Sequence, residues 1–259
     1  MGEGPRKWDC RLKPGNKVIL QGASGSGKSH YMRNIIWANR NDYDIIILVS
    51  KTEKFDPGFG DLVPNLFVHI DLDVDLIRRF IERQKMAMRM EKDPAIMFVF
   101  DDCGHKKKEV NSEWMKEIFI LGRHLDMTVL IALQYVYMME PTQRQNLDVL
   151  LMVGSLADPD QIHSAYFKEI SMDLFLDLYN DITDNRNAFI LLGGAGRVLD
   201  RVRWYGAPAL PYAPPGMCYW HYFPVAYRLH LEHYMVKLEN SGKAKFQLLD
   251  EQGIFSVRH

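Results

Sequence analysis

Eight consecutive residues near the amino terminus have the types and the spacing of a phosphate-binding loop. They match the pattern G-x-x-x-x-G-K-[ST] at every fixed position, and they are Gly22, Ala23, Ser24, Gly25, Ser26, Gly27, Lys28 and Ser29. Glycines permit a tight turn in which several backbone N–H groups point at phosphate oxygens. We expect Lys28 to reach the β- and γ-phosphates and the hydroxyl group of Ser29 to bind Mg²⁺. The segment therefore predicts a nucleoside triphosphate site, and a flexible loop with an exposed lysine is the alternative.

Two carboxylates follow an apolar run at 96–100. Such a run predicts a buried strand, and Asp101 and Asp102 come directly after it. Ligands of open α/β sheets bind at the carboxyl ends of the strands, which places both residues near the phosphate loop. We expect Asp101 to hold Mg²⁺ through water and Asp102 to accept a proton from the attacking water. Alternatively, Asp102 begins a turn or caps the next segment.

Another apolar run, at 128–133, has polar residues of interest on both sides. Gln134 ends the run at the same expected edge as Asp101, where its amide would sense the γ-phosphate and orient the attacking water. A strand-end amide that caps a loop is the alternative. Arg123 precedes the run and, at ~3.3 Å per residue, lies too far from the nucleotide of its own chain. We therefore expect it to act on a neighbouring subunit's nucleotide as an arginine finger. Arg144 competes for that role, and either arginine could instead form a surface salt bridge.

The elements that must position these residues are visible as short apolar runs that alternate with amphipathic stretches. Strands buried on both faces are predicted at 17–21, 45–49, 66–70, 96–100 and 128–133. Helices are predicted at 29–40, 75–91 and 112–125, followed by a helix at 161–179 and a strand at 188–192. This alternation favours an α/β fold, with a mostly parallel sheet and helices on both of its faces.

The composition is that of an ordinary folded chain with a different carboxyl-terminal part. Of the 259 residues, 47% are apolar and 25% are charged, which is typical of globular proteins. The prolines and glycines between 206 and 216 cannot continue a regular element and indicate a linker or an extended arm. We expect an N-terminal arm at 1–13, a P-loop domain at 14–204, and a proline-rich linker with a C-terminal appendage at 205–259.

Charge and cysteine usage limit the setting and the partners. A formal net charge of −1 excludes a chain that coats nucleic acid as a whole, so DNA contact must come from a local patch or from assembly. The triplet at 106–108, three lysines, is such a patch, although a solvated loop is the more ordinary interpretation. Cys10, Cys103 and Cys218 have no paired spacing, which indicates reduced thiols inside a cell. The first fifteen residues lack a signal peptide's apolar segment, and no apolar run approaches the ~18 residues of a membrane span.

In combination, these motifs resemble the genome-packaging ATPases of large nucleocytoplasmic DNA viruses, a group within the FtsK/HerA superfamily of DNA-pumping motors. The resemblance covers roughly residues 14–200. It rests on GASGSGKS, on the strand that ends in Asp101-Asp102, on GRHLDMTVLIALQ at 122–134, and on the segment from Arg144 to Asn146. Cellular relatives usually carry Asp-Glu where this chain has Asp-Asp, which favours the viral branch.

The resemblance implies a RecA-like P-loop ATPase core that uses ATP and Mg²⁺ and works as a homo-oligomer in a ring. It implies double-stranded viral DNA as the substrate and the viral capsid as a partner, without a membrane. It also implies an intracellular location, in the host cytoplasm where the virus assembles, with the virion as a further site. The positions that match the family's functional residues are Lys28, Ser29, Asp101, Asp102, Gln134 and Arg123.

Two other functions use the same kind of phosphate loop. A small-molecule kinase of the nucleotide type needs a mobile lid with several arginines, which Arg197, Arg201 and Arg203 could supply. A non-motor, nucleotide-dependent switch that reads guanine needs an Asn-Lys-x-Asp element after a later strand, and the sequence has none. A lid does not account for Gln134 at a strand end, which favours the motor.

Overall fold

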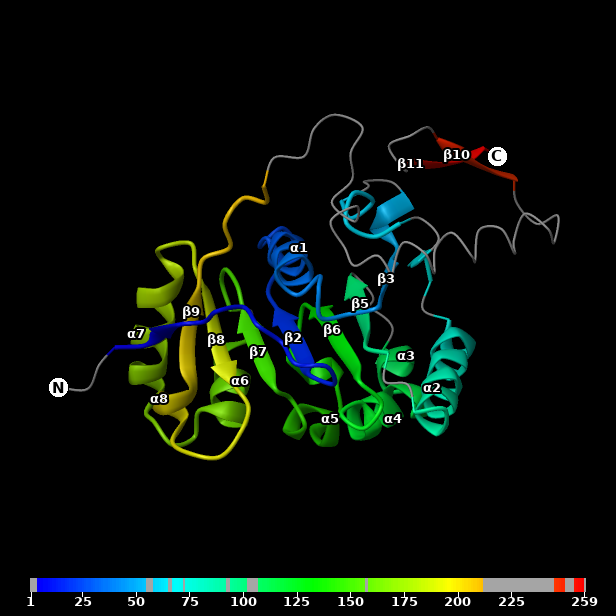
Figure 1. Ribbon diagram of the computed structural model, residues 1–259. Coiled ribbons are helices and arrows are strands. Elements are labelled where there is room, and N and C mark those ends of the chain that lie inside the picture. The colour runs from blue at the N-terminus through cyan, green and yellow to red at the C-terminus, as the bar shows by residue number, and fades with distance from the viewer. Residues whose placement is uncertain are drawn as a thin grey trace.

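The computed structural model describes residues 4–54, 58–64, 67–71, 73–91, 94–101, 107–156 and 158–211, and two strands near the carboxyl terminus. Its centre is a nine-stranded sheet in the order β1-β9-β8-β7-β2-β6-β5-β3-β4 (Figure 1). The strands are β1 (Arg6–Lys7), β2 (Lys17–Gln21), β3 (Ile45–Ser50), β4 (Val68–His69), β5 (Ile96–Asp101), β6 (Met127–Leu133), β7 (Val149–Met152), β8 (Ala188–Leu192) and β9 (Val202–Tyr205). A separate antiparallel pair consists of β10 (Lys245–Leu249) and β11 (Ile254–Arg258).

Strand direction gives the sheet two chemically different edges. All strand pairs of the nine-stranded sheet are parallel except the two that β8 makes with β7 and β9. In the centre, Gln21 of β2 lies opposite Leu133 of β6 and Met152 of β7. The carboxyl ends of β2, β3, β5, β6 and β7 therefore meet at one edge, which we call the carboxyl edge. Their amino ends meet at the opposite edge, the amino edge.

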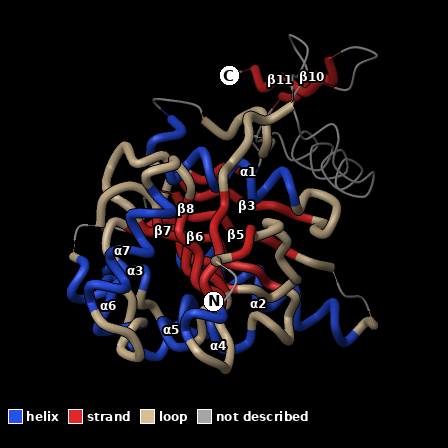
Figure 2. Tube along the Cα trace, turned by 90° about the vertical axis from the view of Figure 1, so that its left-hand side faces the viewer, coloured by secondary structure: helices blue, strands red, loops and turns tan. Residues whose placement is uncertain are grey.

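Four adjacent strands of the sheet are buried on both faces. Every residue of β2, β3, β5 and β6 is buried, as expected for runs of apolar and β-branched side chains covered on both sides. Figure 2 shows helices on both sides of the sheet. They are α1 (Lys28–Ala38), α2 (Val74–Arg89), α3 (Lys107–Val110), α4 (Glu113–Leu121), α5 (Pro141–Gln145), α6 (Pro159–Tyr166), α7 (Met172–Thr183) and α8 (Val198–Arg201). The predicted fold class is confirmed.

The predicted strands agree closely with the sheet. Those at 17–21 and 188–192 coincide with β2 and β8, and β3, β5 and β6 each extend one residue beyond the prediction. The run at 66–70 is longer than the strand that it contains, because only Val68 and His69 pair with β3 as β4. Three strands of the nine-stranded sheet, β1, β7 and β9, have no counterpart among the predicted runs. They contain two to four residues each, too few to stand out as apolar runs.

The single helix predicted at 161–179 is wrong, because the structure has two helices there. The chain leaves α6 at Phe167, whose φ is −123°. Ser171 then begins α7 by accepting a hydrogen bond from the backbone N–H of Leu174 at 3.3 Å. The Phe167 ring stacks on Phe175 of α7 with the ring centroids 4.5 Å apart. Apolar periodicity thus continues across the break, which explains why the sequence pattern did not reveal it.

Part of the predicted N-terminal arm belongs to the sheet. Arg6 and Lys7 pair with β9, and the backbone N–H of Trp8 donates to the carbonyl of Trp204 at 2.8 Å. The division into 1–13, 14–204 and 205–259 stays a prediction, and residues 212–244 lie outside the described residues. Within the described part of the chain, no helix combines the length and the apolar character that a membrane crossing requires.

Candidate active site

The phosphate loop connects the end of β2 to the start of α1 at the carboxyl edge. Its backbone needs glycine at two kinds of position. Gly25 and Gly27 have φ values of +74° and +92°, in the left-handed region that side chains disfavour. Gly22 is limited by space instead, since a Cβ atom there would lie 2.6 Å from the carbonyl oxygen of Val153. The loop is therefore held against β7 by close backbone packing.

The amino end of α1 has the features of an anion site. Gly27 occupies the N-cap, and no side chain in the described residues caps this helix end. Its first backbone N–H groups lack intrahelical partners, and the helix dipole adds partial positive charge. The Lys28 ammonium donates to the carbonyls of Gly22 at 2.9 Å and Ala23 at 2.7 Å, which folds it back over the loop. With only 7% of Lys28 exposed, its charge is held at the point where phosphates would lie.

Two polar atoms beside the loop are buried without a hydrogen-bond partner in the described structure. They are the hydroxyl group of Ser26 and the Oε1 atom of Gln21, the last residue of β2. Buried polar groups are nearly always satisfied, so orphaned atoms of this kind fit a site that completes its hydrogen bonds with a ligand. Sequence reasoning missed Gln21. Its signal was a polar residue that ends an apolar strand, the same signal that indicated Gln134.

Ser29 and Asp101 meet beside the loop, although 72 positions separate them. The Ser29 hydroxyl group donates to Oδ2 of Asp101 at 3.1 Å, and Asp101 is 4% exposed. A hydroxyl group and a carboxylate form a hard oxygen set of the type that Mg²⁺ prefers. The pair fits the predicted metal site.

Other predicted residues lie at the same edge or outside the described residues. Gln134 directly follows Leu133, whose carbonyl accepts the backbone N–H of Gly22 at 3.2 Å, and it is exposed. Asp102 and Lys106 lie outside the described residues. Lys107 and Lys108 begin α3, where both are exposed.

One further residue at this edge was missed by sequence reasoning. Ser50 ends β3 beside Asp101 in the strand register and is fully buried. Its hydroxyl group is 3.1 Å from that of Thr52. Like Gln21, it is a polar residue that closes an apolar run, a pattern that indicates the carboxyl edge but not which strand lies next to Asp101.

Arg123 lies at the amino edge, as its position before β6 predicts. Its guanidinium forms an ion pair with Asp148, which is largely buried. The other oxygen of Asp148 accepts the backbone N–H of Lys17 at 2.8 Å and lies 3.9 Å from the Lys17 ammonium. Strand β2 separates this cluster from the loop by about 17 Å, at ~3.3 Å per residue. Arg123 is therefore remote from the phosphate loop of its own chain.

Lys17 is an unusual member of this cluster, because a lysine side chain is here only 3% exposed. Burial lowers the pKa of Lys17, the Asp148 carboxylate opposes that decrease, and the nearby Arg123 adds to it. The sequence offered no signal for this group beyond a lysine at the start of an apolar strand. We use the name amino-edge cluster for Lys17, Arg123 and Asp148.

The remaining arginines named from the sequence also lie away from the phosphate loop. Arg144 of α5 stacks on the ring of Tyr137 at 4.1 Å. Arg197 pairs with Asp200, and Arg201 donates to the carbonyl of Leu192 at 3.2 Å, next to the start of β7. Since this is the amino edge, these arginines form no lid over the phosphate loop, which counts against the kinase alternative.

Comparison with known proteins identifies the family. Residues 9–182 match the model of the poxvirus A32 protein. The chain belongs to this family. A similar relative is protein 075L of Invertebrate iridescent virus 6, which is 32% identical over 200 residues, 70% of this chain and 77% of that protein. The DNA packaging protein OPG160 of vaccinia virus (strain Copenhagen) is 28% identical over 131 residues, 48% of this chain and 47% of its own length.

Solved structures share the fold of this A32 family member. The genome packaging NTPase B204 from Sulfolobus turreted icosahedral virus 2, in complex with ATPγS, superposes with a TM-score of 0.50. It is 18% identical, and the match covers 75% of this chain and 98% of B204. The conjugation coupling protein TcpA of pCW3 with ATPγS has a TM-score of 0.50 and 16% identity, over 74% of this chain and 60% of TcpA.

Proposed function

We propose that this protein is an ATP-hydrolysing motor that moves viral genomic double-stranded DNA into the capsid. The observation that carries the proposal is the contact between Ser29 and Asp101 beside the phosphate loop, in a chain of the A32 family. A relative in vaccinia virus is named a DNA packaging protein, and a protein of the same fold is named a genome packaging NTPase. The site of action is then the infected cell.

In the proposed mechanism, different residues of the site carry out different steps of ATP hydrolysis. The loop amides, the end of α1 and Lys28 bind and orient the triphosphate. Ser29 and Asp101 would hold Mg²⁺, which supplies charge neutralisation at the β- and γ-phosphates. Asp102 accepts the proton of the attacking water, and Gln134 orients that water.

A further cation for this edge comes, in our proposal, from a second copy of the chain. Arg123 cannot reach its own phosphate loop, and the kinase-type arginines lie at the same remote edge. A ring in which the amino edge of one subunit faces the carboxyl edge of the next would bring Arg123 to the γ-phosphate. Such a head-to-tail contact closes into a ring of identical subunits.

Hydrolysis measured with and without long duplex DNA tests the motor. We expect DNA to stimulate ATP turnover of the wild-type protein. Lys28→Ala should lower turnover about a hundredfold or more, as for other groups that stabilise transition-state charge. Asp102→Asn should act similarly through loss of the proton acceptor. Lys7→Ala, which removes an exposed lysine from the outermost strand β1, four strands away from β2, is the matched control and should hydrolyse ATP normally.

Other outcomes of this assay would contradict the proposal. Transfer of phosphate to a nucleoside or a sugar would identify a kinase. If duplex DNA of any length fails to change the rate of ATP turnover, the protein is an ATPase that is not a DNA motor.

DNA contact is proposed at the lysine triplet 106–108, which follows the two carboxylates in the chain. Contacts of lysines with the DNA backbone bind DNA without reading its bases. Each neutralised phosphate of B-DNA adds about −0.9 to the slope of the logarithm of affinity against the logarithm of salt concentration. Replacing Lys106, Lys107 and Lys108 by alanine should flatten the salt dependence of DNA affinity. Lys7→Ala should leave the slope unchanged. An unchanged slope in the triple variant would show that these lysines are not the DNA contact.

A further inference from the structure

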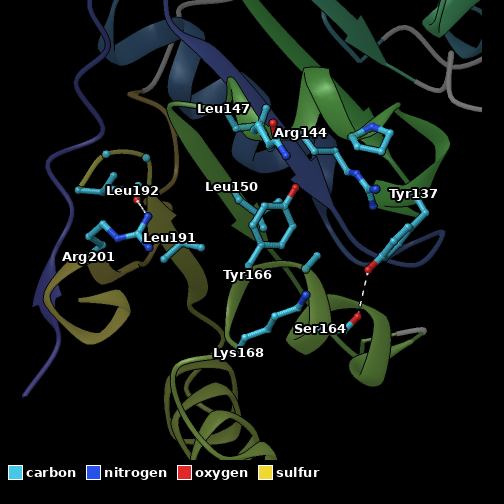
Figure 3. A pocket seen from close by; sticks show the side chains of 15 residues that line it. Tyr137, Arg144, Leu147, Leu150, Ser164, Tyr166, Lys168, Leu191, Leu192 and Arg201 are labelled. Atoms are coloured by element: carbon cyan, nitrogen blue, oxygen red, sulfur yellow. Dashed lines mark hydrogen bonds between the residues drawn. The ribbon is translucent and has the colours of Figure 1, made fainter. Parts of the chain in front are cut away.

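A cavity of about 400 Å³ opens at the amino edge, well away from the phosphate loop (Figure 3). It lies between α5, α6, the end of β8, the start of β7 and α8. Three cationic side chains line it: Arg144, Lys168 and Arg201. No acidic residue is part of its lining in the described structure. The charged side chains of this lining are therefore all cationic.

Several donors that line the cavity lack partners. In the described structure, Nη1 of Arg144, Nε of Arg201 and the hydroxyl group of Tyr166 are buried and make no hydrogen bond. Buried donors without partners are rare in folded proteins, because each one loses its hydration without compensation. Burial raises the pKa of Tyr166, so its hydroxyl group stays protonated and remains a donor. A bound anion between Arg144 and Tyr166 would satisfy these two groups, whereas Arg201 lies on the other side of the cavity, beside Leu192 (Figure 3).

The donors are held in place rather than free to swing. The guanidinium of Arg144 stacks on the ring of Tyr137 at 4.1 Å. Another nitrogen of Arg201 donates to the carbonyl of Leu192 at 3.2 Å, a bond that is drawn in Figure 3. Such fixed, weakly hydrated guanidinium groups are well suited to phosphate oxygens. Preorganised donors also lower the entropy cost of binding.

The rest of the lining suggests the size and the character of the ligand. Leucine side chains of β7 and β8, together with the ring of Tyr137, form apolar walls. A volume of about 400 Å³ is within the usual range for small-molecule sites, which are mostly apolar with a few placed polar groups. Backbone phosphates of duplex DNA are gripped by side chains on an open surface, whereas these donors are recessed. The cavity thus fits a small molecule with a phosphate group and an apolar or planar part.

We propose that this cavity is a second anion site, which binds the phosphate group of a ligand the size of a mononucleotide. Arg144 and the Tyr166 hydroxyl group contact the phosphate oxygens, and Lys168 and Arg201 add positive charge to the lining. The site is separate from the phosphate loop and goes beyond the proposed motor, because neither hydrolysis nor DNA binding requires it.

Calorimetric titration of AMP into the full-length Lys28→Ala protein tests the site, since this background weakens binding at the phosphate loop. We expect AMP to bind, and inorganic phosphate to compete with it. Adding Arg144→Ala should weaken AMP binding about tenfold, as for the loss of a charged hydrogen bond, and adding Lys168→Ala or Arg201→Ala should weaken it less. Arg144→Lys should retain part of the affinity. Lys13→Ala, an exposed lysine outside the cavity, is the matched control and should have no effect.

Thermal unfolding of each variant establishes that it is folded before its affinity is compared. No AMP binding in the Lys28→Ala background would overturn the proposal. Equal affinities for the cavity variants and the Lys13→Ala control would also overturn it. Cavity variants that lose affinity for a short DNA duplex but not for AMP would assign the cations to DNA and reject a small ligand.

Discussion

The two edges of the central sheet differ in how their polar groups are assembled. At the carboxyl edge, eight consecutive residues, 22–29, supply the phosphate loop, and most of its binding groups are backbone amides and a helix end. At the amino edge, the cluster of Lys17, Arg123 and Asp148 comes from three distant segments and consists of charged side chains. One edge is thus built by local backbone geometry and the other by tertiary packing.

This difference follows from the direction of the strands. Residues that end strands β2, β3, β5 and β6 meet around the loop, whereas residues that precede β6 and β7 meet one strand length away. A chain with a phosphate loop at one edge and an exposed arginine at the other is suited to head-to-tail assembly. The active site would then be shared between neighbouring subunits. The carboxyl edge of one subunit and the amino edge of the next would each supply half of it.

The largest expected effect comes from Arg123→Ala, which removes the proposed trans-acting cation. Turnover of ATP should fall about a thousandfold, the lower end of the range for an arginine finger, while nucleotide affinity is kept. Mixing this variant with Lys28→Ala protein should restore part of the activity, because each protein retains the half that the other lacks. Single-turnover hydrolysis and nucleotide titration on the same samples measure both properties.

The control for this experiment is Arg123→Lys, which preserves the charge next to Asp148 but not the planar, bidentate guanidinium. It should unfold at nearly the wild-type temperature and still lose most of its turnover. A mixture without any recovery, or full activity in a strictly monomeric preparation, would contradict a finger that acts between subunits.

A loss of stability is expected when Asp148 is removed from the amino edge. Asp148→Ala leaves the buried Lys17 without its carboxylate and its backbone N–H without an acceptor. Breaking a buried pair costs about 3 kcal/mol or more, because the remaining charge stays desolvated. Asp200→Ala, in an exposed pair with Arg197, should cost less than about 1 kcal/mol. Urea unfolding of both variants makes the comparison, and equal losses would show that the cluster has no special role in stability.

At the carboxyl edge, two glycine replacements distinguish a glycine that is required for lack of space from one that is required for its backbone conformation. Gly22→Ala places a Cβ atom 2.6 Å from the Val153 carbonyl oxygen, so the loop must shift. We expect a loss of about 2 kcal/mol, as for an overpacked site, and weaker nucleotide binding. Gly25→Ala meets no neighbouring atom and strains only the left-handed backbone, at about 1 kcal/mol. Equal losses in both variants would remove the distinction between the two glycines.

The sequence predicts the carboxyl edge better than the amino edge, because the first is built largely from one contiguous segment and the second from distant residues. The phosphate loop and the ends of β5 and β6 were predictable, because the loop is contiguous and a buried parallel strand reads as an apolar run. Ser50 and Gln21 were missed, although each follows the rule that worked for Asp101. Strand order explains this, since only the three-dimensional register shows which strand ends are neighbours.

At the amino edge, little was predictable beyond the location of Arg123. Its partner Asp148 lies in a loop 25 positions later, before β7, a strand too short to be recognised from its sequence. The cavity residues Arg144, Tyr166 and Arg201 likewise come from three elements, and no local spacing connects them. The break between α6 and α7 was hidden by apolar side chains that pack across it.

The smallest expected effect is a dependence of the free energy of unfolding on pH, caused by the titration of Lys17. Burial lowers the pKa of this lysine in the folded protein, whereas in the unfolded chain it stays near its ordinary value of about 10.4. Between these two values the unfolded chain binds the extra proton, so the free energy of unfolding rises with pH through this interval. The Lys17→Met variant lacks this contribution, and its stability relative to the wild type should therefore decrease as the pH approaches about 10. Urea unfolding of both proteins at several pH values below that limit measures the difference, in which the effects of buried tyrosines cancel. A difference that stays constant with pH would mean that Lys17 keeps an ordinary pKa, and that the amino edge solvates its charge better than its burial implies.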